Sequence, residues 1–140
     1  MCTWYLPSLS RTIDAIASDH APHTYDEKQV EFPYAPFGIV GLETSVGISF
    51  THLVYGDILS VQQLIEKMSV NPRRILHLPT IRIAEGEKAN LTIIDPEVEW
   101  IVKTESFFSK SKNSPFDKTK LKGRAIGVIN NNAAYWRLES

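Results

Sequence analysis

The chain has 140 residues, of which 43% are hydrophobic and 22% are charged, and both values are typical of a folded globular protein. The net charge of −1 gives no electrostatic support for binding nucleic acid or an anionic membrane surface. The single cysteine, Cys2, excludes an internal disulfide and fits a reducing, cytoplasmic compartment. The sequence contains no apolar run of the length that a membrane-spanning helix needs.

Residues 13–23 predict a buried strand that ends in polar side chains. Alternate residues of a strand face the same side, and the row that ends at Asp19 is apolar and small: Ile13, Ala15 and Ala17. Pro22 lacks an N–H and cannot continue a ladder. We therefore expect Asp19 at the C-terminal end of a strand, where α/β folds build their active sites. The alternative is that Asp19 is only the N-cap of a following helix.

Residues 24–36 are polar and include Pro33 and Pro36, which is the composition of a loop. A loop that follows a strand end is a suitable place for a lid over a site. An ordinary connecting loop fits the composition equally well.

Three helical segments follow. Residues 41–55 place apolar side chains at helical spacing. A second helix, over residues 60–69, begins at Ser60, and Gln63 three residues later completes a capping-box pattern. Residues 71–76 begin with Asn-Pro, a cap residue before a proline at the first helical position, and predict a short third helix.

After residue 79 the hydrophobic pattern changes from a helical to an alternating period, so the rest of the chain is predicted to be mainly strand. The alternation begins at Ile81 and Ile83. The strands that the pattern predicts most clearly are 89–94, 99–103, 124–130 and 133–138. The last two are joined by three asparagines, and asparagine tolerates the positive φ of a tight turn.

The spacing of residues 19–28, Asp-x-Ala-Pro-His followed by four residues and Lys28, resembles the dihydroorotase signature of the amidohydrolase superfamily. Residues 35–44, Ala-Pro-Phe-Gly-Ile-Val-Gly-Leu-Glu-Thr, resemble the segment that follows this signature in the same family. The resemblance covers residues 12–138. Related hydantoinases and allantoinases usually have other residues where this chain has Ala-Pro-His.

The resemblance implies an α/β fold, namely a metal-dependent (β/α) barrel with a small composite β domain. It assigns residues 11–78 to the last barrel strand, the signature loop and the closing helices, and residues 79–140 to the C-terminal part of the small β-rich domain. A complete barrel takes about 250 residues, so we expect this chain to be a C-terminal fragment or a truncated product. Residues 1–10 do not resemble the family and are expected to be a leader.

The activity that the resemblance implies is the zinc-dependent, reversible hydrolysis of dihydroorotate to N-carbamoyl-aspartate in pyrimidine biosynthesis. Asp19 matches the carboxylate that binds the metal and carries the proton, so it is the candidate for both catalysis and metal binding. His23 matches the substrate-binding histidine, and Phe37 and Gly38 match a backbone contact to the substrate ring. His20 would face the opposite side of the strand from Asp19 and is expected to be structural. Lys28 belongs to the signature but is assigned no catalytic role.

The other metal ligands of the family come from barrel strands that have no counterpart in this sequence. Zinc sites use three or four protein ligands, so Asp19 alone is not expected to hold zinc, and we expect the isolated chain to be inactive. Helix faces and strand edges without their partners predict self-association or a homo-oligomer. Two alternatives stay open: another cyclic amidohydrolase, such as an allantoinase or dihydropyrimidinase, and a non-catalytic interaction module.

Overall fold

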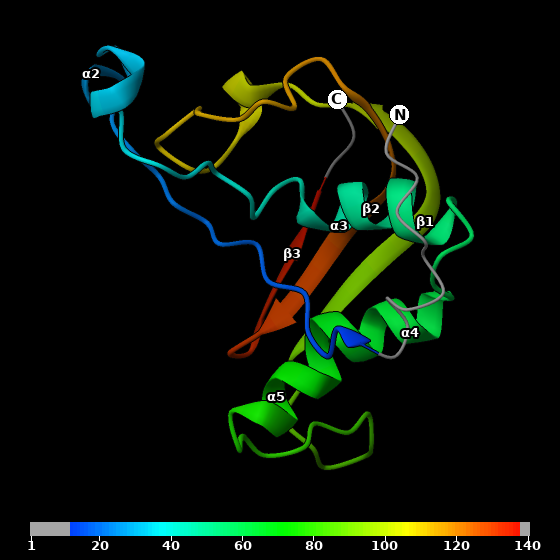
Figure 1. Cartoon of the computed structure of the whole chain (residues 1–140). Helices are drawn as coiled ribbons and strands as arrows, with labels where there is room; N and C mark the ends of the chain where they lie inside the picture. Colours follow the sequence, from blue (N-terminus) through cyan, green and yellow to red (C-terminus); the bar gives the residue numbers. More distant parts are fainter. Residues whose placement is uncertain (1–11, 138–140) are drawn as a thin grey trace.

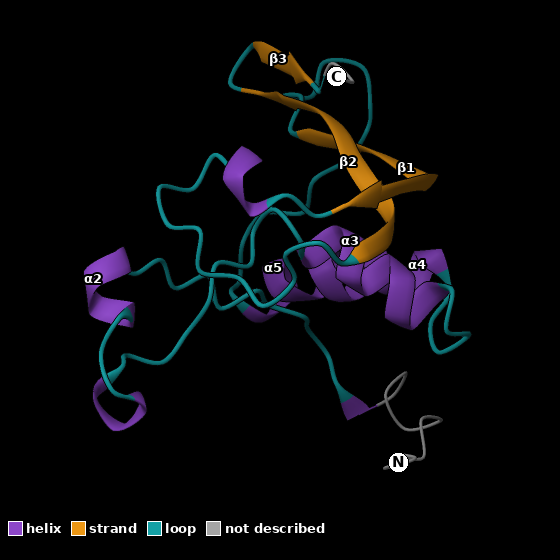
Figure 2. Ribbon diagram, turned by 90° about the horizontal axis from the view of Figure 1, so that it is seen from above, coloured by secondary structure: helices purple, strands orange, loops and turns teal. Residues whose placement is uncertain are grey.

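The computed structural model describes residues 12–137 (Figure 1). It has a helical layer and a three-stranded antiparallel sheet in the order β1-β2-β3. The helices lie against one side of the sheet, and the loop that carries α2 (Tyr25–Lys28) extends away from both layers (Figure 2). The described chain is therefore α/β, and the predicted order of helices first and strands afterwards is confirmed.

The first predicted helix is confirmed as α3 (Ser45–Ser49), which runs directly into the π-helical segment η3 (Phe50–Val54). The π-helical spacing is shown by the 2.9 Å hydrogen bond from the Tyr55 N–H to the carbonyl of Phe50, five residues earlier. Phe50 is buried in the same core cluster as Leu64 of the next helix. None of the helices within residues 12–137 has the length and apolar content that a membrane span requires.

The second predicted helix is also confirmed, but it is longer than predicted. α4 (Val61–Ile65), η4 (Glu66–Val70) and α5 (Asn71–Ile75) follow one another without a break. The predicted capping box is present at its start. The Gln63 N–H donates to Ser60 Oγ at 3.2 Å, and the Ser60 N–H donates to Gln63 Oε1 at 2.8 Å.

The predicted cap at Asn71 is wrong. Val70 and Asn71 both have helical backbone angles, and the Asn71 side chain caps no backbone N–H of α5. Asn71 Nδ2 instead donates to the Asp14 carbonyl at 2.9 Å. The side chain therefore fastens the start of the described chain to the helix rather than beginning a new helix.

The sheet places β2 (Lys120–Asn130) between β1 (Leu91–Ile101) and β3 (Ala133–Trp136). The predicted asparagine turn between β2 and β3 is confirmed, because residues 131–132 have φ values of 49° and 62°. Leu138, with which the last predicted strand ends, lies outside the described residues.

The gap between the predicted strands 89–94 and 99–103 contains Pro96 and is a bulge rather than the end of a strand. The β1–β2 register shifts between Asp95 and Glu99, where Pro96 has no N–H to donate. Asp95 Oδ1 accepts the Glu97 N–H at 2.9 Å within the bulge. The two strands predicted before and after Pro96 are therefore one strand.

The strand predicted at residues 13–19 is wrong, since this stretch has no regular secondary structure. A single parallel bridge to Ile39 directly follows it. The supposed inward row is not buried, as Ile13 is 43% exposed. A helix holds the backbone instead: the Ile16 N–H donates to the Lys67 carbonyl at 3.0 Å, and the buried Lys67 ammonium donates to the Ile13 carbonyl. A ladder needs a neighbouring strand, and the described residues provide none here.

Residues 79–84 form no strand either, although Ile81 and Ile83 alternate. Ile83 is 87% exposed, and nothing in the described part of the chain pairs with this stretch. Alternation stabilises a strand only where one face packs on neighbours, so two alternating isoleucines do not suffice.

The helical layer and the sheet meet at a position that only glycine allows. Gly123 of β2 has φ +83°, and a Cβ there would lie 2.6 Å from the Cβ of Phe50. Close by, the Lys122 N–H donates to Thr51 Oγ1 at 2.8 Å. The close approach lets a helix side chain bond directly to the backbone of the sheet.

We expect Leu64→Ala to lower the free energy of unfolding by about 2–5 kcal/mol, because truncation of a buried leucine leaves a cavity. Leu64 is 1% exposed and packs with Phe50 and Leu59. Urea unfolding followed by circular dichroism measures the change. Ile65→Ala is the matched control in the same helix, 48% exposed, with an expected loss of about 1 kcal/mol or less. Equal losses in the two variants would contradict this packing.

Candidate functional site

The signature segment and the motif that follows it lie side by side and form the frame of the candidate site. The Ala21 N–H donates to the Ile39 carbonyl at 2.9 Å. His20 Nδ1 accepts the Gly41 N–H at 3.1 Å and the Leu42 N–H at 3.4 Å. A neutral imidazole that accepts at Nδ1 carries its proton on Nε2. His20 therefore ties the two segments together, which agrees with the structural role predicted for it.

Three of the predicted site residues, His23, Phe37 and Gly38, are brought together. His23 Nε2 lies 2.9 Å from the Phe37 carbonyl oxygen, and this nitrogen is the donor because a carbonyl only accepts. Gly38 has φ +107°, and a Cβ there would lie 2.5 Å from the Cβ of Ala21, so no other residue fits. The Phe37 side chain is 92% exposed, so the backbone of Phe37 is the part that is held.

Asp19, the fourth predicted site residue, is not joined to these three. It is exposed, with φ +44°, and no hydrogen bond or ion pair links it to His23, Phe37 or Gly38 in the described part of the chain. Within residues 12–137 no group of three or more His, Cys, Asp or Glu side chains is placed to hold a metal ion. The catalytic and metal-binding roles of Asp19 therefore stay predictions.

Glu27 completes a second capping box, at the start of α2, beside the imidazole of His23. The Thr24 N–H donates to Glu27 Oε2 at 2.8 Å, and the Glu27 N–H donates to Thr24 Oγ1 at 3.3 Å. The same Oε2 lies 3.6 Å from His23 Nδ1. The hydrogen bonds from Thr24 hold the pKa of Glu27 below its ordinary value of 4.5, and the bond from the Thr24 backbone N–H has the larger effect. This box was not predicted from the sequence, although Thr-x-x-Glu is the same type of signal that identifies the box at Ser60.

Two further polar side chains converge on Gly38. Lys28 Nζ and Asn113 Nδ2 each donate to the Gly38 carbonyl at 2.9 Å, and Lys28 Nζ also donates to the Pro36 carbonyl. Asn113 is 75 positions from Gly38 in the sequence. No local pattern in a single sequence indicates a contact of that span.

A cavity of about 850 Å³ lies between the signature loop and residues 110–114. Its charged and polar lining includes His23, Glu27, Lys28 and Asn113. More cationic than anionic side chains line it, which suits an anionic ligand. Asp19, Phe37 and Gly38 do not line the cavity, so it shares only His23 with the predicted site.

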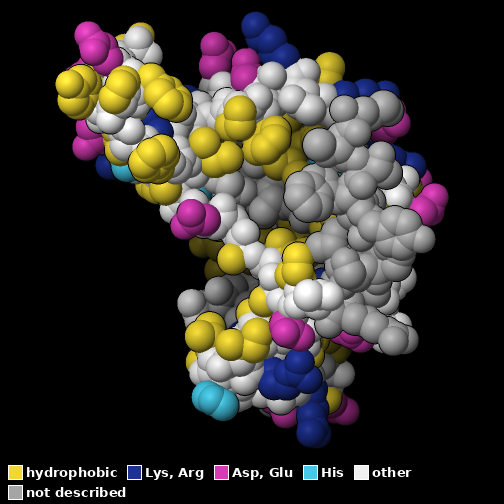
Figure 3. Space-filling view, in the orientation of Figure 1, with side chains coloured by type: hydrophobic (Ala, Val, Ile, Leu, Met, Phe, Trp, Pro, Cys, Tyr) yellow, Lys and Arg dark blue, Asp and Glu magenta, His cyan; other side chains and the backbone are white. Residues whose placement is uncertain are grey.

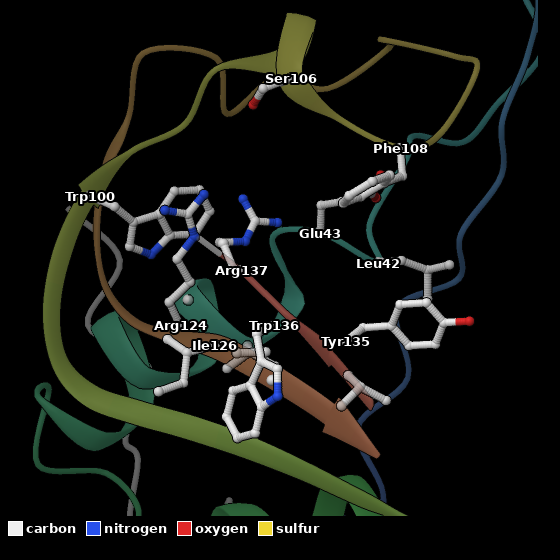
Figure 4. A pocket seen from close by; sticks show the side chains of 15 residues that line it. Leu42, Glu43, Trp100, Ser106, Phe108, Arg124, Ile126, Tyr135, Trp136 and Arg137 are labelled. Atoms are coloured by element: carbon white, nitrogen blue, oxygen red, sulfur yellow. The ribbon is translucent and has the colours of Figure 1, made fainter. Parts of the chain in front are cut away.

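A second cavity, of about 510 Å³, lies on the sheet (Figure 4). The Arg124 guanidinium is 4.4 Å from the centre of the Trp100 ring at its wall. Glu43 Oε1 accepts the Ser109 N–H at 2.9 Å, whereas Glu43 Oε2 is buried and has no hydrogen-bond partner among the described residues. None of the predicted site residues lines this cavity.

No protein-family model matches the chain. Curated proteins do match it. The chain is 54% identical over 126 residues to the dihydroorotase of Chlorobaculum tepidum, which is 90% of this chain and 29% of that protein. It is 44% identical over 121 residues to the dihydroorotase of Bacillus subtilis, which is 86% of this chain and 28% of that protein. The chain is a relative of the dihydroorotases. It spans less than a third of the length of these relatives.

The solved structures that resemble this dihydroorotase relative are cyclic amidohydrolases. The L-hydantoinase of Arthrobacter aurescens matches 96% of this chain and 32% of its own, with a TM-score of 0.82 and 27% sequence identity. The dihydropyrimidinase of Brevibacillus agri matches 94% of this chain with a TM-score of 0.80; at 23% identity it shows the likeness of fold alone. The fold is therefore that of a part of these enzymes.

We expect the Glu27 carboxyl to titrate below pH 4.5, because its anion accepts the Thr24 N–H. A carboxyl whose pKa is lowered on folding stabilises the loop above pH 4.5, and this contribution is lost as the pH falls through the lowered pKa. Carbon NMR of the Glu27 carboxyl during an acid titration of the intact chain measures the pKa. Thr24→Ala, which removes the hydroxyl but keeps the N–H, should raise it part of the way toward 4.5. A native Glu27 that titrates at or above 4.5 would contradict the capping box.

Proposed function

We propose that this chain acts as part of a dihydroorotase and contributes to the reversible opening of dihydroorotate to N-carbamoyl-aspartate. The observation that carries this function is the 54% identity to a dihydroorotase over 90% of the chain. The contact of His23 with the Phe37 backbone supports it, because the residues proposed to bind the substrate lie together.

Each proposed role suits the chemistry of its residue. The Nε2–H of His23 is a donor that can hold the substrate carboxylate. The backbone of Phe37 and Gly38 offers polar groups to the substrate ring, and glycine permits close approach. The Asp19 carboxylate can take up a proton and return it, as a general base and then a general acid.

Zinc, where the family uses it, supplies a water whose pKa falls to about 7. Zinc sites use three or four protein ligands. Asp19 provides one carboxylate, and residues 12–137 assemble no group of three such ligands, so they do not fit a zinc ion by themselves. A zinc ion in the active enzyme therefore needs ligands from beyond the described residues.

We also propose a place for the chain in the larger fold. Residues 11–78 would be the last barrel strand, the signature loop and the closing helices, and residues 79–140 would be part of the small β domain. The likeness to the Arthrobacter hydantoinase supports a part of that fold. Neighbouring barrel strands would supply the ladder that residues 13–19 lack here. The expected leader, residues 1–10, lies outside the described residues. The single cysteine favours the cytoplasm.

A hydantoinase or dihydropyrimidinase activity is the second candidate, because those enzymes are the structural neighbours. The higher identity to dihydroorotases and the Ala-Pro-His of the signature favour dihydroorotate. A non-catalytic interaction module would show no turnover in any context.

A chimera tests the proposed function. In it, this chain replaces the matched 126 residues of the Chlorobaculum tepidum dihydroorotase. We expect the chimera to open dihydroorotate, measured by absorbance, and Asp19→Ala to lower kcat by about 10²–10⁴-fold, the range of general acid–base catalysis. His23→Ala should chiefly raise KM. Asp14→Ala, at an exposed carboxylate, is the control and should change neither constant. Faster opening of dihydropyrimidines than of dihydroorotate would favour the second candidate.

We expect the 140-residue chain alone neither to hold stoichiometric zinc nor to open dihydroorotate at a useful rate. Without a metal the pKa of the water nucleophile stays far above neutral, and the main source of acceleration is lost. Metal analysis and the absorbance assay on one sample measure both quantities. Robust turnover that a chelator and Asp19→Ala both abolish would contradict this expectation.

We expect the isolated chain to self-associate, because hydrophobic side chains gather on the projecting lobe around α2 (Figure 3). Tyr25, Phe32 and Tyr34 on this lobe are 76%, 89% and 78% exposed. Apolar patches of this kind promote association in water. Analytical ultracentrifugation should show a sedimentation coefficient that rises with concentration, and Phe32→Ser should weaken the rise. A compact monomer at micromolar concentration would contradict the expectation.

A further inference from the structure

We propose that Lys28, assisted by Asn113, is a positioning residue that fixes the Phe37–Gly38 backbone for contact with the substrate. The inference rests on the proposed function. It concerns a residue that belongs to the signature but for which the sequence predicts no catalytic role.

The first observation is that three consecutive carbonyls each accept a hydrogen bond from a side chain. Lys28 Nζ donates to Pro36, His23 Nε2 lies 2.9 Å from the Phe37 oxygen, and Lys28 Nζ and Asn113 Nδ2 each donate to Gly38 at 2.9 Å. A carbonyl oxygen has two lone pairs, so the oxygen of Gly38 is fully used. These bonds fix the orientation of the three peptide planes.

The Phe37 side chain adds no packing to this stretch, which gives the hydrogen bonds more weight. Phe37 is 92% exposed and so provides no buried anchor. Gly38 has φ +107°, a conformation that glycine adopts readily. The backbone of glycine is also freer to change conformation than that of any other residue. Two donors on the Gly38 carbonyl remove that freedom.

The two donors come from segments far apart in the sequence. Lys28 ends α2, and Asn113 lies in the loop before β2. The backbone carbonyl of Asn113 accepts the Val40 N–H at 2.9 Å. Lysine suits the task because its ammonium has three donors and can reach two carbonyls at once. Charge-assisted bonds of this kind are stronger than neutral ones. The Lys28 ammonium donates to two backbone carbonyls, so it acts on the loop and is a positioning residue.

The chimera described above provides the functional test. Lys28→Met keeps most of the apolar stem and removes all donors, and Lys88→Met at an exposed lysine is the matched control. We expect Lys28→Met to raise KM for dihydroorotate about ten- to hundredfold, the effect of a misplaced contact, and to change kcat much less. Asn113→Leu should raise KM to a smaller extent, because the Lys28 bonds remain.

A second measurement uses the intact 140-residue chain. The carbonyl carbon shift of Gly38, observed by NMR, should move in Lys28→Met and in Asn113→Leu but not in Lys88→Met. Thermal unfolding of the same samples separates a local change from a loss of folding. If Lys28→Met does not fold, Asn113→Leu alone decides the outcome, by its KM and its Gly38 shift.

The outcomes separate the inference from the proposed function. An active chimera in which Lys28→Met and Asn113→Leu have the KM of the Lys88→Met control would overturn the inference alone, even if their thermal stability fell. An unchanged Gly38 shift in both variants would also overturn it. An unsubstituted chimera that does not open dihydroorotate would overturn the proposed function, and the inference with it.

Discussion

The backbone of residues 13–41 has to satisfy its polar groups without a sheet, and the candidate site depends on how it does so. Buried N–H and C=O groups need partners, and no strand ladder is present here among the described residues. Side chains take over this task. Lys67 and Asn71 hold the first residues to a helix, and His20 and Lys28 hold the signature to the motif after it. The same bonds that replace a ladder therefore determine where His23 and Gly38 lie.

A polar network fastens the other end of the molecule, where the bulge of β1 meets the helical layer. The Tyr55 hydroxyl donates to the Pro96 carbonyl at 2.7 Å and contacts Glu97 Oε1 at 2.8 Å, and Lys122 Nζ is 2.8 Å from Glu97 Oε2. The bond from Lys122 lowers the pKa of Glu97, and the same bond raises the pKa of Lys122. Burial, followed by the Glu97 carboxylate, raises the pKa of Tyr55. The network thus connects the C-terminal end of η3 to the bulge of β1 and to β2.

The parts of the fold that sequence analysis predicted correctly all have local signals. The helix at Ser45 follows from the spacing of apolar residues, the start at Ser60 from a capping box, and the turn after β2 from adjacent asparagines. The strand at residues 13–19 was predicted wrongly, because alternation shows which residues are apolar but not whether a neighbouring strand exists. The bulge at Pro96 was missed since a proline can end a strand or only interrupt its ladder.

Some contacts of the candidate site also have local signals in the sequence, and others do not. The grouping of His23, Phe37 and Gly38 follows from motifs that lie within 16 positions of one another, 23–38. The Thr24 capping box was missed although its signal is local. The contact of Asn113 with Gly38 spans 75 positions and depends on the return of the chain past the loop, which no local pattern reports. Local motifs in the sequence therefore indicate that His23, Phe37 and Gly38 belong together, whereas they do not indicate the groups that hold them in place.

The position of His23 between two acceptors determines how a substrate carboxylate would enter. Its Nε2–H is directed at the Phe37 carbonyl, so a carboxylate bound by His23, as proposed, has to replace that carbonyl as the acceptor. The replacement would leave the Phe37 carbonyl without its donor, while the bonds of Lys28 to Pro36 and Gly38 on either side remain. The hydrogen bonds from Thr24 hold the pKa of Glu27 below its ordinary value of 4.5, and the Glu27 carboxylate lies 3.6 Å from the other ring nitrogen, Nδ1. The loop can therefore exchange one hydrogen bond for the substrate without losing its shape, which is the property that a binding histidine on an exposed loop requires.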